Sequence, residues 1–329
     1  MAGARPPSEF DLIARCFAPL AAGFPGALGL LDDAALLDPA PGTQLVVATD
    51  ALVAGIHFRP DDPAETVGRK LLRVNLSDLA AMGARPIAYQ IAAILPRDLD
   101  LAWLDGFVAG LAEDQARFGV FLCGGDTVAG EGPPALTLTA FGEVARGRAL
   151  RRAGARAGDL VYVSGTVGDG LLGLEALAGE AAFLSAAERE LAVARYRLPE
   201  PRLDLGRALI GLAHAAIDIS DGLAGDLGHI CAASGLGADI AAARLPLSAA
   251  GLAARRADPA FPARAATGGD DYELLFTVAE DRREDVAALA RRLGLPLVEI
   301  GRTTAGGGVR LLDADDAALD LSRGGYRHF

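Results

Sequence analysis

The sequence predicts a two-domain protein of mixed α/β class. The chain has 329 residues, and at roughly 100–200 residues per domain this length favours two domains. Strand-like and helix-like segments occur together in both halves, which is typical of α/β or α+β proteins. A basic segment at 145–159 is punctuated by glycine and has no hydrophobic period. Because linkers are polar and rich in glycine, we expect domains over residues 1–147 and 148–329.

Hydrophobic spacing predicts the elements of the first half. Residues 64–82 carry four apolar residues at helical spacing and stop at Gly83, which predicts a helix that ends there. Short apolar runs such as QLVVA at 44–48 predict strands. The predicted elements are helices over 9–22, 64–82 and 101–118, and strands over 44–48, 87–95, 120–126 and 136–144.

The second half repeats this mixture. The run HAAIDIS at 214–220 predicts a strand that leads into a helix over 221–233, and LLGLEALAG at 171–179 predicts a helix after a glycine-rich loop. The remaining predicted elements are strands over 160–165, 273–279 and 296–301, and helices over 184–197 and 281–293. The pattern does not determine whether the strands run parallel.

The charge balance excludes several classes of partner. Lys and Arg number 31 against 43 Asp and Glu, so the formal net charge is −12. Nucleic acids and anionic membranes are negatively charged as well, which makes both poor partners for this chain. No apolar run reaches the ~18 residues of a membrane span, and the first residues lack the apolar core of a signal peptide. We therefore expect a cytoplasmic protein.

The small numbers of cysteine and lysine residues argue against several kinds of binding site. The cysteines, Cys16, Cys123 and Cys231, are odd in number and far apart, which argues against a disulfide framework and a structural zinc site. The sole lysine, Lys70, is followed by Leu71, whereas a Walker A loop needs Lys before Ser or Thr. A nucleotide would thus be bound without a phosphate-binding lysine of that kind.

Aspartates recur where apolar runs end next to glycine or another small residue. One more, Asp78, lies one turn after Asn75 on the predicted helix over 64–82, so both face the same side. Each acid alone could cap a helix or stabilise a turn. The recurring aspartates are Asp32, Asp33, Asp50, Asp126, Asp218, Asp221, Asp270 and Asp271.

Taken as a set, these acids indicate a metal site. Gathered carboxylates repel one another unless a bound cation compensates them. Ligands that are all oxygen select Mg²⁺, Ca²⁺ or Mn²⁺ rather than zinc. A few carboxylates that hold Mg²⁺ together with substrate phosphates are the usual arrangement in phosphoryl transfer. The residues therefore predict an acid-lined site for several Mg²⁺ ions and a phosphate substrate.

A glycine-rich stretch offers a competing interpretation. Residues 168–173, GDGLLG, match the GxGxxG dinucleotide fingerprint between a predicted strand and a predicted helix. That fingerprint also needs a second strand with an acid about 20 residues on. Here the stretch AAFLSAAERELAV predicts helix instead, so a close-packed glycine turn is favoured.

A set of ordered motifs resembles one enzyme family along nearly the whole chain. The motifs are DDAALL, TDALVAGIHF, GRKLLRVNLSDLAAMGARP, GGDTVAG, GRALRRAGARAGD, AIDISDGLAGDLGH, GGDDYELLFTV, IGRTT and GGYRHF. The chain resembles the thiamine-monophosphate kinases, of the superfamily that includes aminoimidazole ribonucleotide synthetase and selenophosphate synthetase. Short pieces such as GGD are weak signals, but NLSDLAAMGA and TDALVAGIHF are specific in combination.

The resemblance implies both a fold and a reaction. It implies an aminoimidazole ribonucleotide synthetase-like fold whose N-terminal domain binds metal and ATP and forms a homodimer through its sheet. The C-terminal domain completes the ATP and thiamine-phosphate site. The implied reaction transfers the γ-phosphoryl group of ATP to thiamine monophosphate with the help of several Mg²⁺ ions, and so gives thiamine diphosphate in the last step of its biosynthesis.

The resemblance also implies roles for individual residues. Metal positions match Asp33, Thr49, Asp50, Asp78, Asp126, Asp218 and Asp221, of which Asp50, Asp78, Asp126 and Asp221 are implied to be catalytic. ATP positions match Gly125, Asp126, Arg152 and Ser220. Thiamine-phosphate positions match His57, Asp270 and Tyr326. Without the resemblance, Arg152 reads as a solvated charge, His57 equally well as a core histidine, and Tyr326 as a surface aromatic.

Three positions depart from the family's pattern. Leu31 stands where the first acidic motif usually has glycine, so we expect its backbone to avoid positive φ. Asp270 stands where glutamate is common, and its side chain is one methylene shorter. Val128 stands where a second threonine often follows GGDT, which removes a hydroxyl but no carboxylate.

Two alternatives stay open at this point. One is another ATP-dependent enzyme of the same superfamily, although Cys16 lies in a predicted helix and the N-terminus lacks the lysine expected of a selenophosphate synthetase. The other is a catalytically silent nucleotide-binding or metal-binding homologue. The intact acids argue against the second alternative.

Overall fold

The computed structural model describes residues 9–98 and 100–321 and divides into two compact units. The N-terminal unit comprises the residues up to Leu79 together with Arg85–Arg146. The C-terminal unit comprises Ala80–Ala84 and the chain from Gly147 onward. Each unit contains its own sheet, in agreement with the predicted mixed class.

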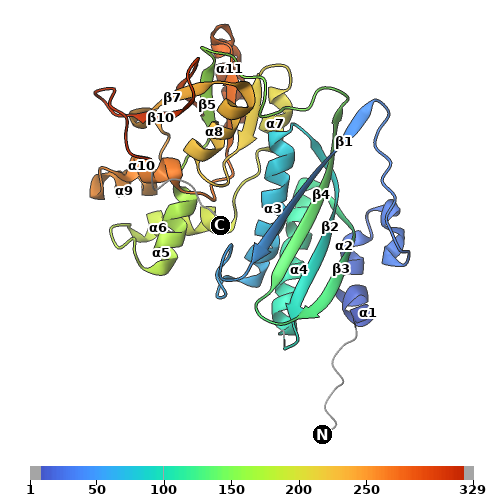
Figure 1. Cartoon of the computed structure of the whole chain (residues 1–329). Helices are drawn as coiled ribbons and strands as arrows, with labels where there is room; N and C mark the ends of the chain where they lie inside the picture. The colour runs from blue at the N-terminus through green and yellow to red at the C-terminus, as the bar shows by residue number, and fades with distance from the viewer. Residues whose placement is uncertain (1–8, 99, 322–329) are drawn as a thin grey trace. The chain divides into compact units, whose positions relative to one another are not determined.

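The N-terminal unit is built on a four-stranded sheet with the strand order β1-β4-β2-β3. Strands β2 and β3 run parallel, and the other two pairs are antiparallel. The two long helices α3 and α4 cover one face of this sheet (Figure 1). The bounds are β1 Thr43–Val53, α3 Ala64–Ala81, β2 Arg85–Pro96, α4 Leu101–Phe118, β3 Phe121–Gly130 and β4 Ala135–Ala145.

Close packing and one buried ion pair fix α3 against α4. A Cβ atom on Gly110 would lie 2.0 Å from the carbonyl oxygen of Glu65, so only glycine allows this approach. Arg73 of α3 donates from Nε to Asp114 of α4 at 2.5 Å, and both side chains are buried. These contacts set the rotation of α3, the helix that carries Asn75 and Asp78.

Short helical segments precede the sheet and lie beside β3 (Figure 1). The predicted helix over 9–22 is interrupted by a π-helical turn and is followed by a 3₁₀ segment. Ala21 and Ala27 of these segments pack with Ala88 and Cys123 of the sheet. The bounds are α1 Glu9–Leu12, η1 Ile13–Phe17, α2 Ala18–Ala21 and η2 Pro25–Leu30.

The C-terminal unit contains a six-stranded mixed sheet with the order β10-β7-β9-β5-β8-β6. Strands β10 and β7 run parallel, whereas the other neighbours are antiparallel. The strands are β5 Leu160–Ser164, β6 Ala215–Asp218, β7 Gly237–Ala241, β8 Leu274–Val278, β9 Leu297–Thr304 and β10 Gly308–Leu312. The helices are α5 Asp169–Ala178, α6 Ala186–Arg197, α7 Leu203–Leu209, α8 Leu223–Ser234, α9 Ala249–Ala257, α10 Phe261–Thr267 and α11 Arg283–Leu293.

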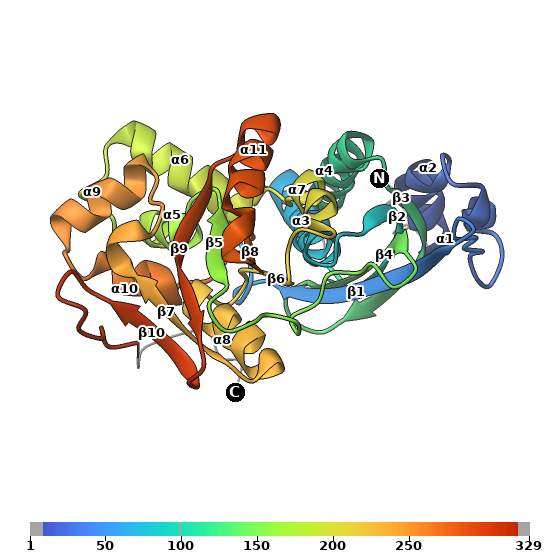
Figure 2. The same ribbon diagram turned by 90° about the horizontal axis from the view of Figure 1, so that it is seen from above.

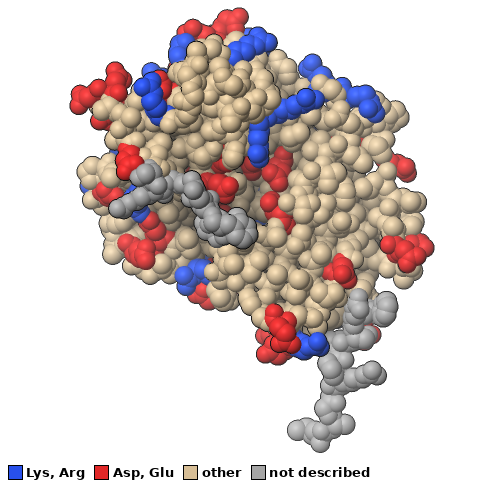
Figure 3. Space-filling model, in the orientation of Figure 1, with Lys and Arg blue, Asp and Glu red and all other residues tan. Residues whose placement is uncertain are grey.

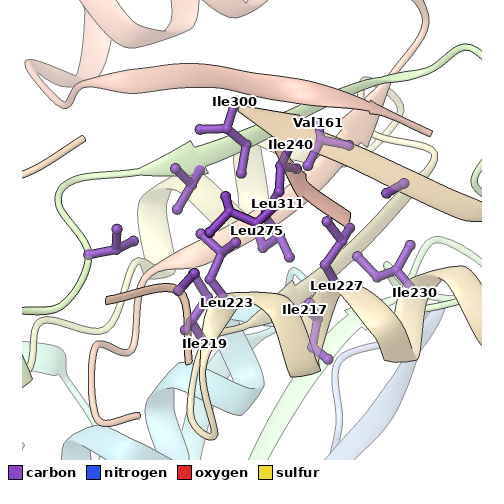
Figure 4. Close-up of a cluster of buried hydrophobic side chains, with 14 of the residues drawn as sticks. Val161, Ile217, Ile219, Leu223, Leu227, Ile230, Ile240, Leu275, Ile300 and Leu311 are labelled. Carbon is purple, nitrogen blue, oxygen red and sulfur yellow. The ribbon is translucent and has the colours of Figure 1, made fainter. Parts of the chain in front are cut away.

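Apolar side chains bury both faces of this sheet. On one face, Leu223, Leu227 and Ile230 of α8 pack on strand residues such as Ile217 and Leu275 (Figure 4). Helices α7 and α11 pack on the other face (Figure 2). Strands β5, β6 and β8 are buried along their whole length, which explains why they read as continuous apolar runs rather than as alternating patterns.

Among the described residues, five α-helices and β-strands were not predicted from the sequence: α7, α9, α10, β7 and β10. None is longer than nine residues. Helices and strands this short lack enough periods to be distinguished from loops. Their alanine and glycine content weakens the pattern further, because these residues occur in every class of structure.

Two general expectations concern charge and membranes. On the face shown in Figure 3, acidic and basic side chains lie in small interspersed groups over the described residues. Among the residues that the structure describes, no helix is both long and apolar enough to cross a membrane. Cys16, Cys123 and Cys231 are all buried and unbridged.

Candidate active site

The middle of β1 is tied to α3 through a buried asparagine. Over the described part of the chain, strand β1 lies at the edge of its sheet, next to β4. The Asp50 N–H donates to Oδ1 of Asn75 at 3.0 Å, and Nδ2 of Asn75 donates to the Leu71 carbonyl at 2.9 Å. Asp78 follows three residues after Asn75 on α3. The structure thus anchors the strand that carries Asp50 to the helix that carries Asp78.

Thr49 belongs to the other face of the sheet. Neighbouring residues on a strand point to opposite faces, so the Thr49 side chain points away from that of Asp50. Its Oγ1 lies 2.9 Å from Oγ1 of Thr139 on β4. The two side chains that were expected to share a metal site therefore start from opposite faces of β1.

A pocket of about 530 Å³ lies in the N-terminal unit and collects three of the acids. Asp32, Asp33 and Asp126 line it together with Gly125. A Cβ atom on Gly125 would lie 2.0 Å from the Ile91 carbonyl oxygen, so glycine is required there. The rest of the wall includes polar and aromatic side chains from the sheet, among them Gln90, Thr137, Thr139 and Phe141.

The first acidic motif adopts an unusual backbone. Leu28, Gly29 and Leu30 all have positive φ, at 52°, 68° and 59°. Leu31 itself has φ −107°, as expected for a leucine where the family has glycine. The left-handed turn is thus made by the residues before it, at a cost of about 1 kcal/mol or more for each leucine. Asp32 and Asp33 follow directly and line the pocket.

Leu31→Gly should leave the fold and the turnover nearly unchanged. The Leu31 side chain is 90% exposed, so its removal forfeits almost no buried surface. We expect the free energy of unfolding to fall by less than about 1 kcal/mol, through the greater freedom of glycine in the unfolded chain. Thermal melting and a Mg²⁺ titration of activity measure this. A collapse of the fold would show that the first acidic motif is misaligned with the family.

In the C-terminal unit, one buried carboxylate organises the loop after β6. Oδ2 of Asp226, in the first turn of α8, accepts hydrogen bonds from the backbone N–H groups of Ser220, Asp221 and Gly222 at 3.1, 3.2 and 3.2 Å. Burial, together with the negative charges of Asp218 and Asp221, raises the pKa of Asp226 to about 7, although the Ser220 and Asp221 N–H donors act in the opposite direction. Three carboxyl groups of this loop are therefore close enough to interact.

A second loop, at 269–273, is hydrogen-bonded to the first. Asp270 N–H donates to the Ser220 carbonyl at 2.9 Å, and Tyr272 N–H donates to the Ile219 carbonyl at 2.8 Å. Asp270 has φ 69°, a conformation that aspartate tolerates better than most residues. The departure from glutamate at position 270 thus suits the backbone that this loop adopts. Ser220, Asp221 and Asp270 are brought together in one unit.

The glycine-rich stretch at 168–173 is not a dinucleotide site. Gly168 and Gly170 at the start of α5 donate their N–H groups to the carboxylate of Asp271, at 2.7 and 3.2 Å. Complete burial raises the pKa of Asp271 to about 8, although the two N–H donors act in the opposite direction. The backbone donors that a pyrophosphate would need are therefore engaged by the chain's own side chain, in agreement with the close-packed turn.

A cluster of ion pairs around Glu273, at the end of the second loop, was not predicted from the sequence. Glu273 is fully buried and accepts from Arg195 at 2.5 Å, from Arg202 at 2.6 Å and from the Ser164 hydroxyl at 2.5 Å. Its backbone carbonyl accepts the Ile219 N–H at 2.9 Å. A glutamate directly before the apolar run LLFTV was the signal that could have found it. The cluster fixes the start of β8 and, through it, both loops.

Arg152, His57 and Tyr326 are the remaining predicted site residues. Arg152 is exposed, and its loop is held by Ser234, whose Oγ accepts from the N–H groups of Gly154 and Ala155 at 3.2 Å each. His57 lies in the loop after β1, in the N-terminal unit. Tyr326 lies outside the described residues.

The acids fit a hard cation in kind, without forming a ready-made cage. Over residues 9–98 and 100–321, no three His, Cys, Asp or Glu side chains converge closely enough to hold a metal. Three carboxylates nevertheless line one pocket in the N-terminal unit, and three interact around the 218–226 loop. Oxygen donors of this kind suit Mg²⁺, which keeps several waters and binds through one or two carboxylates plus phosphate oxygens.

Comparison with known proteins identifies the family. Residues 31–144 match the AIR synthase related protein N-terminal domain, and residues 156–314 match the corresponding C-terminal domain. The thiamine-monophosphate kinase of Escherichia coli K12 is 44% identical over 326 residues, which is 98% of either chain. The chain belongs to the thiamine-monophosphate kinase family. The predicted family, fold class and class of enzyme, a phosphotransferase, are confirmed.

Solved structures of the family have the same architecture. The thiamine-monophosphate kinase of Stenotrophomonas maltophilia K279a is 43% identical and superimposes with a TM-score of 0.80, covering 88% of this chain and 91% of that one. AaThiL complexed with AMPPCP and TMP is 29% identical, with a TM-score of 0.78 and full coverage of both chains. Family membership therefore extends over both units.

Proposed function

We propose that this protein phosphorylates thiamine monophosphate with ATP and releases thiamine diphosphate and ADP. The 44% identity to a thiamine-monophosphate kinase over 98% of both chains carries this proposal. A relative of the same fold is known in complex with AMPPCP and TMP, an ATP analogue and the acceptor. The chain keeps every aspartate that the family motifs require, which disfavours a silent homologue.

The reaction needs charge neutralisation more than a base. The acceptor oxygen belongs to a phosphate group and is already anionic, so it needs no strong general base to attack. The enzyme must instead hold two anionic groups, the acceptor phosphate and the γ-phosphate of ATP, close together and in line for the transfer. When bound, Mg²⁺ ions neutralise the phosphate oxygens and orient the transfer. The carboxylates of this chain hold those ions, and Arg152 adds a guanidinium for phosphate oxygens.

We assign the residues to these tasks as the family motifs imply. Gly125, Asp126, Arg152 and Ser220 bind ATP, and the pocket that Asp126 lines takes the nucleotide. His57, Asp270 and Tyr326 bind the acceptor, so both units supply residues to the reaction. The metal ligands are Asp33, Thr49, Asp50, Asp78, Asp126, Asp218 and Asp221.

We also propose that the protein is a homodimer formed through the N-terminal sheet. Its face opposite α3 and α4 exposes Leu45 and Val47 of β1, Ile94 of β2 and Val128 of β3. Exposed large apolar side chains on one face of a sheet favour a protein interface there. Val128, which replaces a threonine, adds apolar surface to that face. Sedimentation equilibrium gives the oligomeric state.

One experiment decides the proposed function. The purified protein is incubated with Mg²⁺, ATP and thiamine monophosphate, and thiamine diphosphate is measured by chromatography. Formation of ADP and thiamine diphosphate in equal amounts supports the proposal. ATP hydrolysis without thiamine diphosphate, or no reaction over a range of Mg²⁺ concentrations, would overturn it.

Tyr326→Ala should weaken the binding of thiamine monophosphate and leave the binding of ATP unchanged. An aromatic face next to the cationic thiazolium contributes ~0.5–2 kcal/mol, so we expect KM for thiamine monophosphate to rise roughly 2- to 30-fold. KM for ATP should stay constant, and Tyr326→Phe should keep most of the affinity because the ring face is retained. Initial-rate kinetics test this. A rise confined to KM for ATP would place the C-terminal residues with the nucleotide.

A further inference from the structure

His57 is held at three points in a compact loop that follows β1. Its N–H donates to the Val53 carbonyl at 2.9 Å, and its ring Nδ1 accepts from the Val53 N–H at 3.1 Å. Its carbonyl accepts from Nζ of Lys70 at 3.2 Å. Gly55, with φ 82°, donates to the Phe58 carbonyl at 2.7 Å and closes the loop. The imidazole is therefore fixed to the end of the strand that carries Asp50.

Lys70 is an unusual residue in this chain. It is the sole lysine among 31 basic residues, and it is 2% exposed. Burial of an ammonium group costs desolvation free energy that must be offset by specific contacts. A lysine supplies a compact charge on a flexible stem, whereas arginine supplies a wide planar fork. A compact ammonium of this kind makes the contact with the His57 carbonyl, at 3.2 Å.

The contact with Val53 determines which ring nitrogen carries the proton. An N–H group donates to Nδ1, so Nδ1 is the acceptor nitrogen. A neutral imidazole has one donor and one acceptor nitrogen, which places the proton on Nε2. His57 consequently presents an N–H donor at Nε2, and an N–H donor matches an anionic oxygen.

We propose that Lys70 is a positioning residue for the acceptor: by holding the His57 carbonyl, it keeps Nδ1 on the Val53 N–H and directs Nε2–H to a phosphate oxygen of thiamine monophosphate. The proposal rests on the proposed function, which assigns His57 to the acceptor. Lys70 acts through His57 and touches neither substrate. The proposal predicts that Lys70 and His57 contribute to the same step, which is the binding of thiamine monophosphate.

The first test is equilibrium binding of thiamine monophosphate in the presence of Mg²⁺ and AMPPCP, measured by calorimetry. Lys70→Met keeps an unbranched side chain that is one atom shorter and removes the charge, and we expect the Kd for thiamine monophosphate to rise roughly 3- to 30-fold. The Kd for AMPPCP should not change. Arg69→Met is the matched control, because Arg69 is the preceding residue of α3 but pairs with Asp114 of α4.

Two variants of His57 separate its nitrogens. Gln places an amide N–H near the position of Nε2, so His57→Gln should retain part of the affinity. Asn places its amide near Nδ1 and offers no donor near Nε2, so His57→Asn should lose as much affinity as Lys70→Met or more. Lys70→Met added to His57→Asn should cause no further loss, since the lysine acts through the histidine. The loss should be absent when thiamine replaces its monophosphate as ligand.

Long-range ¹H–¹⁵N NMR of histidine-labelled protein tests the tautomer without activity. The chain has four histidines, and the His57 signal is assigned by its absence in His57→Gln. We expect the Nε2–H tautomer in the wild type and a mixture of the two neutral tautomers in Lys70→Met. A wild-type spectrum with the proton on Nδ1 would overturn the inference even if Lys70→Met failed to fold.

The outcomes distinguish this inference from the proposed function. The inference is overturned if Lys70→Met keeps the native melting temperature and an unchanged Kd for thiamine monophosphate while His57→Asn weakens binding. Additive losses in the double variant, or equal losses with thiamine, sink it as well. An unchanged Kd in His57→Asn removes His57 from the acceptor site. Absence of thiamine monophosphate binding in the wild type overturns the proposed function itself.

Discussion

Asp50→Asn should lower kcat more than roughly 100-fold while the protein stays folded. Loss of partners around a metal ligand typically costs 10–100-fold, and loss of a ligand's own charge costs more. Asparagine keeps the volume of the side chain, and the backbone N–H of residue 50 still donates to Asn75. We therefore expect the melting temperature without ligands to stay within about 3 °C of the wild type.

Kinetics at saturating ATP and thiamine monophosphate, repeated at several Mg²⁺ concentrations, measure the effect. Asp281→Asn is a suitable control, because Asp281 is an exposed acid at the start of the η4 segment Glu280–Arg282. It should retain wild-type kcat. A near-normal kcat for Asp50→Asn would remove Asp50 from the metal site, and a large fall in melting temperature would instead make its role structural.

Glu273→Ala should produce the largest loss of stability in the C-terminal unit. The substitution leaves Arg195 and Arg202 pointing at a buried site without their carboxylate. Removal of one partner from a buried ion pair typically costs about 3–5 kcal/mol. The Ser164 hydroxyl also loses its acceptor. Glu273→Gln keeps the shape and two possible hydrogen bonds, so its loss should be smaller.

Urea unfolding can show where this loss falls. The sole tryptophan, Trp103, lies on α4 in the N-terminal unit, so its fluorescence reports on that unit. Far-ultraviolet circular dichroism reports on both units. We expect the dichroism midpoint to move more than the fluorescence midpoint. Glu280→Gln, which removes an exposed pair with Arg302, should move neither, and equal shifts for both glutamates would contradict the burial argument.

The long, regular elements could be predicted from the sequence. Helices α3 and α4 extend over Ala64–Ala81 and Leu101–Phe118, within one residue of the ranges that hydrophobic spacing gave. Five helical turns provide enough repeats for the period to be clear. The strands of the N-terminal unit were found as well, but β1 was expected to end at residue 48 and extends to Val53. Its second half interleaves polar residues such as Asp50 with apolar ones, which obscured the strand.

Pattern alone found the acids but not what holds them in place. The recurrence of aspartate after apolar runs indicated Asp126, Asp218 and Asp221, whereas Asp226 and Glu273 were not singled out. Their roles depend on contacts between segments that are distant in sequence, such as the contact of Ser164 with Glu273, 109 positions further along the chain. A single sequence carries no signal for such pairs. The same holds for Lys70. Because Leu71 follows this sole lysine, the sequence excluded a Walker A loop, but it did not reveal the contact of Lys70 with His57.

Two carboxylates accept hydrogen bonds from the backbone at the N-termini of helices, and this affects how easily catalysis can be lost in evolution. Asp271 engages the first N–H groups of α5, and Asp226 engages those before α8. A phosphate receptor made of backbone amides survives most point mutations, because every residue except proline supplies an N–H. At these two helix starts the amides are already engaged. Under the proposed function, anion recognition would therefore rest on side chains and the ions that they would hold. One substitution can remove a ligand of that kind without disturbing the architecture, which lets duplicated genes keep the fold while they abandon or change the chemistry.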